Sequence, residues 1–273
     1  MLFWFLVSRF WFLVFRATLK NVRDRSDADW EALARKEPYF AVLTDERFLS
    51  GSLSDDRLRE FFASGEAEVQ HLLDLASTYT GAPVATGSAL DFGCGAGRLT
   101  LALARRVTHV AGVDAAPTML QLAARHAAAA GVTNVELVQD LEALSGRQFD
   151  FVCSLIVFQH IPVAKGELLF RRLLTLLGPK GIIAVHFVFD RPGGALKRLA
   201  RRLRSASPLV HRTLQALQRD PLRLPYMQMN CYDRNRILAM LEDAGCRPPT
   251  LIPTDHGGIA GAIVLAGKPP HKS

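Results

Sequence analysis

The 273-residue sequence predicts an α/β fold in which helices cover both faces of a mostly parallel sheet. From residue 88 onward, short apolar runs alternate with amphipathic segments, which is the pattern of repeated β-α-β units. A glycine-rich turn at residues 93–97 follows the first apolar run and precedes a helical segment. In a doubly wound sheet, such a turn lies at the carboxyl end of a strand, where nucleotides bind.

Residues 26–87 predict a helical cap on this domain. One helix is expected to be capped by Asp27 and to stop before Pro38, because proline disrupts the interior of a helix. A second is expected to begin near Ser54 and a third near Glu66, where apolar residues recur at helical spacing.

Five strands and four helices are predicted in the next part of the chain. The strands are Ser88–Phe92, His109–Val113, Val135–Val138, Phe149–Ser154 and Ile182–Phe187. The helices are Arg98–Arg105, Thr118–Ala130, Lys165–Leu177, ended by Gly178-Pro179, and Asp233–Ala244. Two extended segments, Thr250–Pro253 and Ile259–Ala266, then flank the turn Asp255-His256-Gly257-Gly258.

The composition describes a chain that buries a core. Hydrophobic residues make up 49% of the sequence and charged residues 22%, which excludes wholesale disorder. The cysteines (Cys94, Cys153, Cys231 and Cys246) have no paired spacing, so neither a disulfide framework nor a metal site is expected. A reducing, cytoplasmic compartment is the corresponding expectation.

The net charge of +7 is concentrated in one segment. Between Asp190 and Arg236 there are eleven basic residues against three acidic ones. Within it, residues 195–204 predict an amphipathic helix with one basic face, which suits an anionic membrane surface or a polyanionic substrate. A solvated face of a cap helix is the alternative. Aromatic residues are nearly absent from residues 191–223, which disfavours nucleic acid as the partner.

The first sixteen residues contain seven of the chain's aromatic residues. Each apolar piece is shorter than the ~20 residues that cross a bilayer, and the positive charge follows the apolar run instead of preceding it as in a secretory signal. Together with a basic stripe, this pattern predicts that residues 1–25 form a helix in the headgroup region, at the inner face of the membrane. The alternatives are a helix docked on this protein or a partner, or an extension from an upstream start codon.

Two acidic residues follow strands at the edge where the glycine turn lies. Asp114 ends the second strand, where a carboxylate can bind the hydroxyls of an adenosine ribose. Asp140 follows the third strand and is placed to accept a hydrogen bond from an adenine amino group. Arg98 stands where a dinucleotide-binding fingerprint requires its third glycine, which disfavours a nicotinamide-dependent oxidoreductase.

With these residues in view, the chain resembles the class I S-adenosylmethionine-dependent methyltransferases. Five segments match the motifs of that family in order: LDFGCGAGRLT, VAGVDAAPTML, VELVQDLEAL, FDFVCSLIVFQHIP and LLTLLGPKGIIAVHF. The resemblance covers roughly residues 66–190 and 232–267. It implies a Rossmann-like sheet of seven strands, mostly parallel, with the last strand antiparallel between the fifth and sixth. The methyltransferase domain is then 88–267, with a basic insert or substrate lid at 191–231 and a tail at 268–273.

The resemblance also implies which residues contact S-adenosylmethionine. They are Asp91, Gly93, Cys94, Gly95, Gly97, Asp114, Ala115, Met119, Asp140, Leu141, Ser154 and Leu155. In this arrangement Asp91 lies beneath the amino group of the cofactor, while Ser154 and Leu155 line the side of the sulfonium.

Methyl transfer requires few protein groups, because the sulfonium already makes the methyl group electrophilic and the protein mainly aligns the acceptor. A base is needed only where the acceptor loses a proton, and His160 is the candidate. The alternatives are a structural histidine bonded to nearby backbone, and Gln159 as a positioning residue. The expected acceptor is the oxygen or nitrogen of a small or lipid-linked molecule. An RNA or polyanion methyltransferase and a non-catalytic cofactor-binding protein at the membrane are the competing interpretations.

Overall fold

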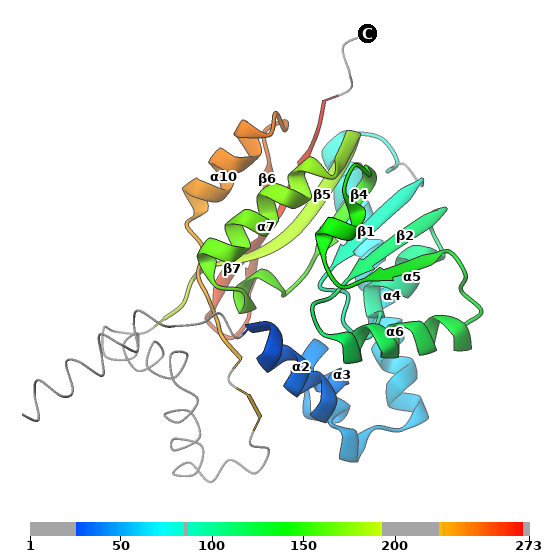
Figure 1. The fold of residues 1–273 in the computed structure, drawn as a ribbon. Coiled ribbons are helices and arrows are strands. Elements are labelled where there is room, and N and C mark those ends of the chain that lie inside the picture. Colours follow the sequence, from blue (N-terminus) through cyan, green and yellow to red (C-terminus); the bar gives the residue numbers. More distant parts are fainter. Residues whose placement is uncertain (1–25, 85–86, 193–223, 226, 270–273) are drawn as a thin grey trace, which may run out of the picture.

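A computed structural model describes residues 26–84, 87–192, 224–225 and 227–269 (Figure 1). The predicted helices at 1–25 and 195–204 therefore lie outside the described residues, as do most of the insert and of the tail. In the part of the chain that is described, no helix combines the length and the apolar character needed to cross a membrane.

Seven strands form one sheet in the order β3-β2-β1-β4-β5-β7-β6. The strands are β1 (Ser88–Phe92), β2 (His109–Val113), β3 (Val135–Val138), β4 (Phe149–Ser154), β5 (Leu177–Asp190), β6 (Thr250–Asp255) and β7 (Ala260–Gly267). The first five are parallel, and β7 pairs antiparallel with both β5 and β6. The predicted fold class is confirmed, and β1 to β4 have the predicted bounds.

The fifth strand is longer than predicted, because it begins at Leu177 and ends at Asp190. The preceding helix ends at Thr175, so Gly178-Pro179 lies within the strand instead of terminating the helix. Lys180 has a positive φ of 62°, and the pairing of β4 with β5 shifts its register just there. Gly178-Pro179, which was expected to end the helix, therefore lies in the irregular first part of the strand.

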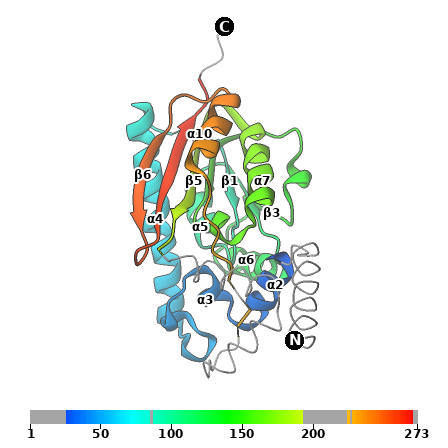
Figure 2. The ribbon, with the colours of Figure 1, turned by 90° about the vertical axis from the view of Figure 1, so that its left-hand side faces the viewer.

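Helices cover both faces of the sheet (Figures 1 and 2). One face packs against α7 (Val163–Thr175) and α10 (Arg234–Asp243), and the other packs against α4 (Asp55–Thr80) and α5 (Arg98–Ala104). Helix α6 (Pro117–Ala129) connects β2 to β3. Both apolar layers are buried, as expected for a parallel sheet with helices on either side.

The cap comprises α2 (Ser26–Lys36), α3 (Pro38–Val42), two short 3₁₀ helices η1 (Glu46–Phe48) and η2 (Ser50–Ser52), and the start of α4. The prediction of two helices after Ser54 is wrong, since α4 is continuous. Its Gly65 marks close packing, because a Cβ there would collide with the backbone oxygen of Arg98 on α5. Asp27 lies inside the first turn of α2, not at its cap.

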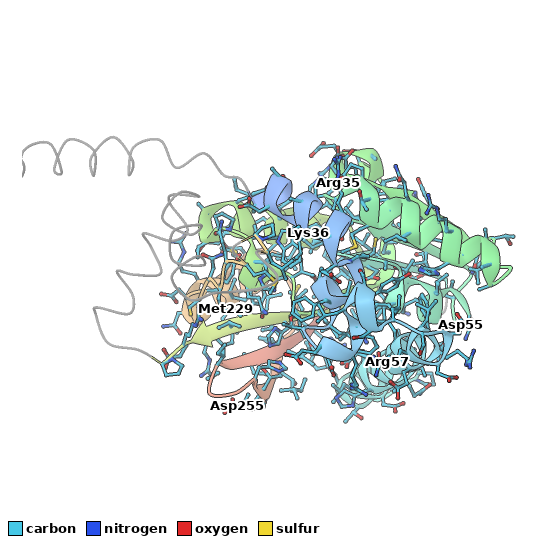
Figure 3. The ribbon with its side chains drawn as sticks, turned by 90° about the horizontal axis from the view of Figure 1, so that it is seen from below. Arg35, Lys36, Asp55, Arg57, Met229 and Asp255 are labelled. Atoms are coloured by element: carbon cyan, nitrogen blue, oxygen red, sulfur yellow. The ribbon has the colours of Figure 1, made fainter. Side chains whose placement is uncertain are left out.

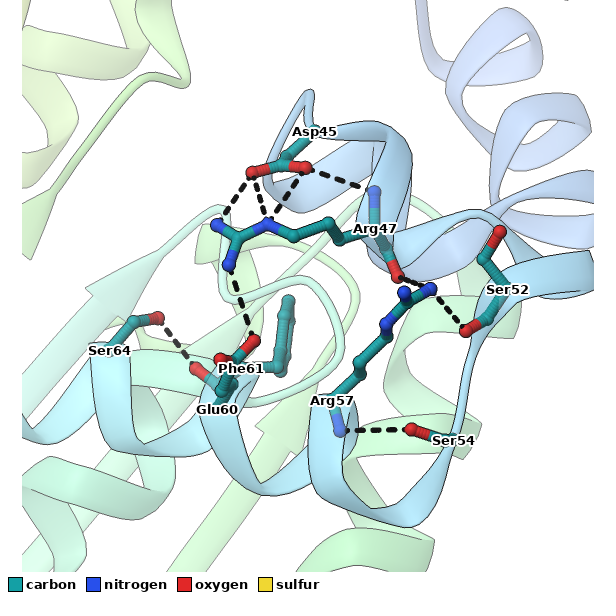
Figure 4. A network of polar contacts seen from close by, with 8 residues as sticks. All are labelled: Asp45, Arg47, Ser52, Ser54, Arg57, Glu60, Phe61 and Ser64. Atoms are coloured by element: carbon teal, nitrogen blue, oxygen red, sulfur yellow. Dashed lines mark hydrogen bonds and ion pairs between the residues drawn. The ribbon is translucent and has the colours of Figure 1, made fainter.

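A polar network joins the two short helices to α4 (Figure 4). The Arg47 guanidinium contacts the Asp45 carboxylate at 2.8 Å and Glu60 of α4 at 3.3 Å. Arg57 donates to the backbone oxygen of Ser52 at 2.7 Å. These groups are exposed, so each contact stabilises the fold only modestly, and together they set the position of the loop.

Helix α2 is fixed to the domain at two points. Its Glu31 carboxylate accepts hydrogen bonds from the backbone N–H of Thr118 at 3.1 Å and from its hydroxyl at 2.7 Å, at the first turn of α6. Lys165 of α7 contacts both carboxylate oxygens of Asp27 at 2.8 Å. Figure 3 views this end of the molecule, where Lys36 of α2 is labelled. Thus α2 connects helices from the two halves of the sheet.

Candidate functional site

A cavity of about 230 Å³ lies at the carboxyl ends of the central strands and is bordered by α2. The predicted residues that line it are Gly93, Gly95, Asp114, Ala115, Met119, Asp140, Leu141, Leu155 and His160. The structure therefore brings together most of the predicted cofactor contacts and the candidate base in one cavity.

The glycine turn borders the cavity where its backbone approaches two valines. Gly93 has φ of 80°, and a Cβ there would collide with the side chain of Val157. Gly95 has φ of 53°, and its Cβ would lie 2.8 Å from Val42 Cγ2. Both valines also line the cavity. Only glycine fits these positions, since they combine a left-handed backbone with no room for a side chain.

Gly97 and Cys94 support the turn but do not line the cavity. Gly97 precedes α5 with φ of 89°, and a Cβ there would lie 3.2 Å from that of Ala123 on α6. The Cys94 thiol is buried, 3.2 Å from the place that a Cβ of Gly112 would occupy. Both residues thus have a role in helix and strand packing, and their contact with the cofactor stays a prediction.

Asp91 and Ser154 also lie outside the lining, although both were predicted to face the cofactor. The buried Asp91 carboxyl accepts a hydrogen bond from the Thr100 hydroxyl at 2.7 Å, and burial raises its pKa to about 6. The Ser154 hydroxyl is fully buried and donates to the backbone oxygen of Phe92 at 2.8 Å. Both side chains tie the strand ends to neighbouring protein groups, and their contact with the cofactor stays a prediction.

Asp114 combines two backbone hydrogen bonds with a position in the cavity wall. Its carboxylate accepts from the N–H of Gly95 and of Ala116, each at 2.9 Å. Withdrawal of the carboxyl group from solvent raises its pKa to about 6, against the effect of these two bonds. The carboxylate keeps further lone pairs that can accept hydroxyl hydrogens from a ligand.

The adjoining wall comes from the loop after β3. Asp140 accepts hydrogen bonds from the N–H groups of Glu142 at 3.0 Å and Ala143 at 3.2 Å, and so caps the short helix η3 (Leu141–Leu144). Leu141 and Met119 are buried beside it. This wall therefore pairs an acidic edge with an apolar surface, as an adenine ring requires.

His160 lies on the opposite side, at the end of η4 (Phe158–His160). Its Nδ1 is 2.7 Å from the backbone oxygen of Gln228, and its Nε2 is 3.2 Å from the amide nitrogen of Gln159. Burial lowers the pKa of His160 to about 4, so the imidazole is neutral near pH 7. The expected alternative of a backbone contact is present, but the partner, Gln228, is distant in sequence and lies near the end of the insert.

Several lining residues could not be found by motif. They come from distant elements: Asp27 and Trp30 of α2, and Lys165 and Leu169 of α7. The Trp30 ring contacts that of His160 edge-on, with centroids 4.9 Å apart. Ile156 also lines the cavity with a φ of 59°, an outlier for a β-branched residue and typical of functional sites.

Comparison with known proteins identifies this region. Residues 89–181 match a family model described as a methyltransferase domain. This segment is similar to methyltransferase domains. It contains the glycine turn, both strand-end acids and His160. The described residues have the class I S-adenosylmethionine-dependent methyltransferase fold.

Individual relatives agree with this assignment. The chain is 41% identical over 81 residues to a ubiquinone biosynthesis O-methyltransferase of Methylobacterium nodulans, covering 29% of this chain and 32% of the relative. It is 35% identical over 108 residues to the 2-heptyl-1-hydroxyquinolin-4(1H)-one methyltransferase of Mycobacteroides abscessus, covering 38% and 47%. The chain thus matches less than half the length of each.

A solved structure supports the fold over most of the chain. The magnesium protoporphyrin IX methyltransferase of Synechocystis PCC 6803, with bound SAH, aligns with a TM-score of 0.54. The alignment covers 85% of this chain and 97% of the other, at 18% sequence identity. At this coverage, the likeness in fold extends beyond residues 89–181.

Proposed function

We propose that the protein transfers a methyl group from S-adenosylmethionine to a hydroxyl oxygen of a small, largely apolar acceptor. The observation that carries the proposal is one cavity that joins the glycine turn and Asp114 to a neutral imidazole, His160. The first two suit an adenosine-containing cofactor, and the third suits an acceptor that must lose a proton.

The residues present fit this cofactor. At Gly93 and Gly95 neighbouring valines leave no room for a side chain, so the backbone itself forms this part of the cavity wall and a ligand can lie close to it. The Asp114 carboxylate, already partly withdrawn from water, would gain hydrogen bonds from the ribose hydroxyls. Asp140 and Leu141 would meet the adenine edge, with Met119 packing on the ring. When bound, S-adenosylmethionine supplies an electrophilic methyl group.

The acceptor side of the cavity is apolar apart from His160 and an ion pair. Trp30, Ile156, Ile161 and Leu169 line it, together with the pair formed by Asp27 and Lys165. An aromatic ring bearing a hydroxyl matches this wall, because Trp30 offers a flat apolar surface beside the imidazole. The names of the relatives, an O-methyltransferase and a hydroxyquinolinone methyltransferase, support an oxygen acceptor.

His160 would take the hydroxyl proton as the new carbon–oxygen bond forms. Its Nδ1 faces a carbonyl oxygen, which can only accept, so Nδ1 bears the hydrogen and Nε2 the lone pair. That lone pair faces the amide nitrogen of Gln159 at 3.2 Å, a contact that the acceptor hydroxyl would replace. Because its pKa is lowered to about 4, the imidazolium would not persist near pH 7 and would release the proton to water. Trp30, packed edge-on against the ring, would restrict the ring's orientation.

The test is transfer of a labelled methyl group from S-adenosylmethionine to a panel of hydroxylated aromatic, lipid, glycan and RNA fractions. We expect label on an apolar hydroxylated acceptor, and none with Asp114→Asn at cofactor concentrations that saturate the native protein. The matched control is Asp233→Asn, because Asp233 also accepts two backbone N–H groups, those of Asn235 and Arg236, but lies outside the cavity. Absence of transfer to every fraction, or label only in RNA, would contradict the proposal.

A lipid-linked acceptor would bring the enzyme to a membrane surface. We propose that residues 1–25 and 195–204, whose sequences combine apolar and basic residues, provide this contact. Flotation with anionic vesicles should be strong for the full chain and weak after deletion of residues 1–25. Equal flotation of the two proteins would contradict the contact at the N-terminus.

A further inference from the structure

The last residues of the insert, together with Tyr232, run along η4, the short helix that carries His160. The backbone N–H of Asn230 donates to the Gln159 oxygen at 2.6 Å, and its side-chain amide donates to the same oxygen at 3.1 Å. Two residues later, the backbone N–H of Tyr232 donates to the oxygen of Val188 in β5 at 2.8 Å. We call residues 228–232 the clasp, because they join η4 to the sheet.

Tyr232 contacts the backbone before and after His160. Its ring is buried, at 3% exposure, and its hydroxyl lies 2.9 Å from the backbone oxygens of both Phe158 and Ile161. The ring reaches this position because residue 166 of α7 is glycine: a Cβ there would collide with the hydroxyl of Tyr232. The clasp thus donates to the backbone carbonyl of residue 159 and, through the single hydrogen of the Tyr232 hydroxyl, to that of residue 158 or 161.

The same segment, together with the Gln159 side-chain amide 3.2 Å from Nε2, determines which nitrogen of His160 bears the proton. The Gln228 backbone oxygen, 2.7 Å from Nδ1, requires a hydrogen on that nitrogen. In a neutral imidazole the other nitrogen is then the acceptor. A clasp displaced by a fraction of an ångström would weaken this bond and allow both tautomers.

We propose that Asn230 and Tyr232 are positioning residues that hold the clasp on η4 and thereby fix the orientation and the tautomer of His160. The proposal rests on the proposed function, in which His160 accepts the hydroxyl proton through Nε2. It assigns a catalytic effect to two side chains that lie outside the lining of the cavity.

Removing the Tyr232 hydroxyl removes the one side-chain donor that the carbonyl oxygens of Phe158 and Ile161 share, while the ring still fills its site. We expect Tyr232→Phe to reduce kcat about tenfold, which corresponds to one hydrogen bond lost at the transition state. The affinity for S-adenosylmethionine should not change, because the glycine turn and Asp114 lie on other elements. Asn230→Ala should act in the same direction.

The matched control is Tyr79→Phe. The Tyr79 hydroxyl also donates to a backbone oxygen, that of Pro248 at 3.1 Å, but it lies outside the cavity and away from η4. Thermal unfolding should show a smaller loss of stability for Tyr79→Phe, whose hydroxyl contact is exposed, than for Tyr232→Phe, and kcat should fall only for Tyr232→Phe. If Tyr232→Phe fails to fold, Asn230→Ala gives the same comparison.

A second readout does not depend on turnover. Nitrogen NMR of the protein labelled with ¹⁵N-histidine, assigned with His160→Gln, reports which ring nitrogen of His160 is protonated. We expect the Nδ1–H tautomer in the native protein and in Tyr79→Phe, and a mixture in Tyr232→Phe and Asn230→Ala. Native-like tautomers in both clasp variants, or kcat values equal to that of Tyr79→Phe, would overturn the proposal. The two proposals can fail separately. If the clasp variants differ from the native protein in the tautomer of His160, but the native protein binds the cofactor and methylates no acceptor, the proposed function is wrong and the role of the clasp in fixing the tautomer is supported.

Discussion

Cofactor affinity should depend on pH through Asp114. The carboxyl group has a pKa of about 6 in the free protein, raised by its withdrawal from solvent. The ribose hydroxyls would donate to the ionised carboxylate, so binding favours that form and lowers the pKa further. Protonation removes part of the acceptor capacity, and the affinity must therefore fall as the pH drops through the pKa of the free protein.

The magnitude follows from this pKa of about 6. One pH unit below it, only about one tenth of the protein has an ionised Asp114, a cost of about 1.4 kcal/mol in binding free energy. We expect a dissociation constant that is nearly constant above about pH 7 and about tenfold higher at pH 5. Binding of the cofactor is therefore weaker in acid.

Isothermal titration calorimetry with S-adenosylmethionine between pH 5 and pH 8 measures this dependence. Asp114→Asn should bind weakly at every pH, while the Asp233→Asn control should follow the native protein. Asp91 also has a pKa of about 6, but its carboxyl group is bonded to Thr100 outside the cavity, so Asp91→Asn should retain the pH dependence. If the affinity of the native protein for S-adenosylmethionine stays constant from pH 5 to pH 8, this reasoning is refuted.

Three further predictions concern the turn, the base and the cap. Gly93→Ala should lower the free energy of unfolding by at least about 1–2 kcal/mol because of the positive φ at residue 93, and it should weaken cofactor binding in calorimetry. Adding Val157→Ala should restore part of the affinity, and no restoration would show that the close approach of Gly93 and Val157 is not the cause. His160→Gln should lower kcat by about 10²-fold or more with unchanged cofactor affinity, and an unchanged kcat would remove His160 as the base. Glu31→Gln weakens the acceptor for the Thr118 N–H and hydroxyl, so chemical denaturation should show a loss of about 1 kcal/mol, and full stability would contradict the role of this contact.

The sheet was predictable because its strands are apolar runs with few alternatives. The bounds of β1 to β4 follow directly from where those runs stop. Helix α4 was divided wrongly, since Gly65 suggests a break in sequence but serves close packing on Arg98 in space. A glycine selected by tertiary contact has the same local signal as one that ends a helix.

The site was predictable only where its residues follow strands. Asp114 and Asp140 lie in the cavity because parallel strands end at a common edge. Ser154 and Leu155 are adjacent in sequence, yet only Leu155 reaches the cavity, since Ser154 is bonded to Phe92. The wall contributed by Trp30 depends on how the cap docks, which no local pattern determines.

The most direct test of the central claim is a crystal structure of the protein with S-adenosylhomocysteine. The account predicts the ligand in the cavity at the carboxyl ends of β1 and β2, with its ribose hydroxyls within hydrogen-bond distance of the Asp114 carboxylate. Its sulfur should point toward the side of the cavity that holds His160. A ligand bound elsewhere, or one in this cavity whose ribose makes no contact with Asp114, would contradict the account.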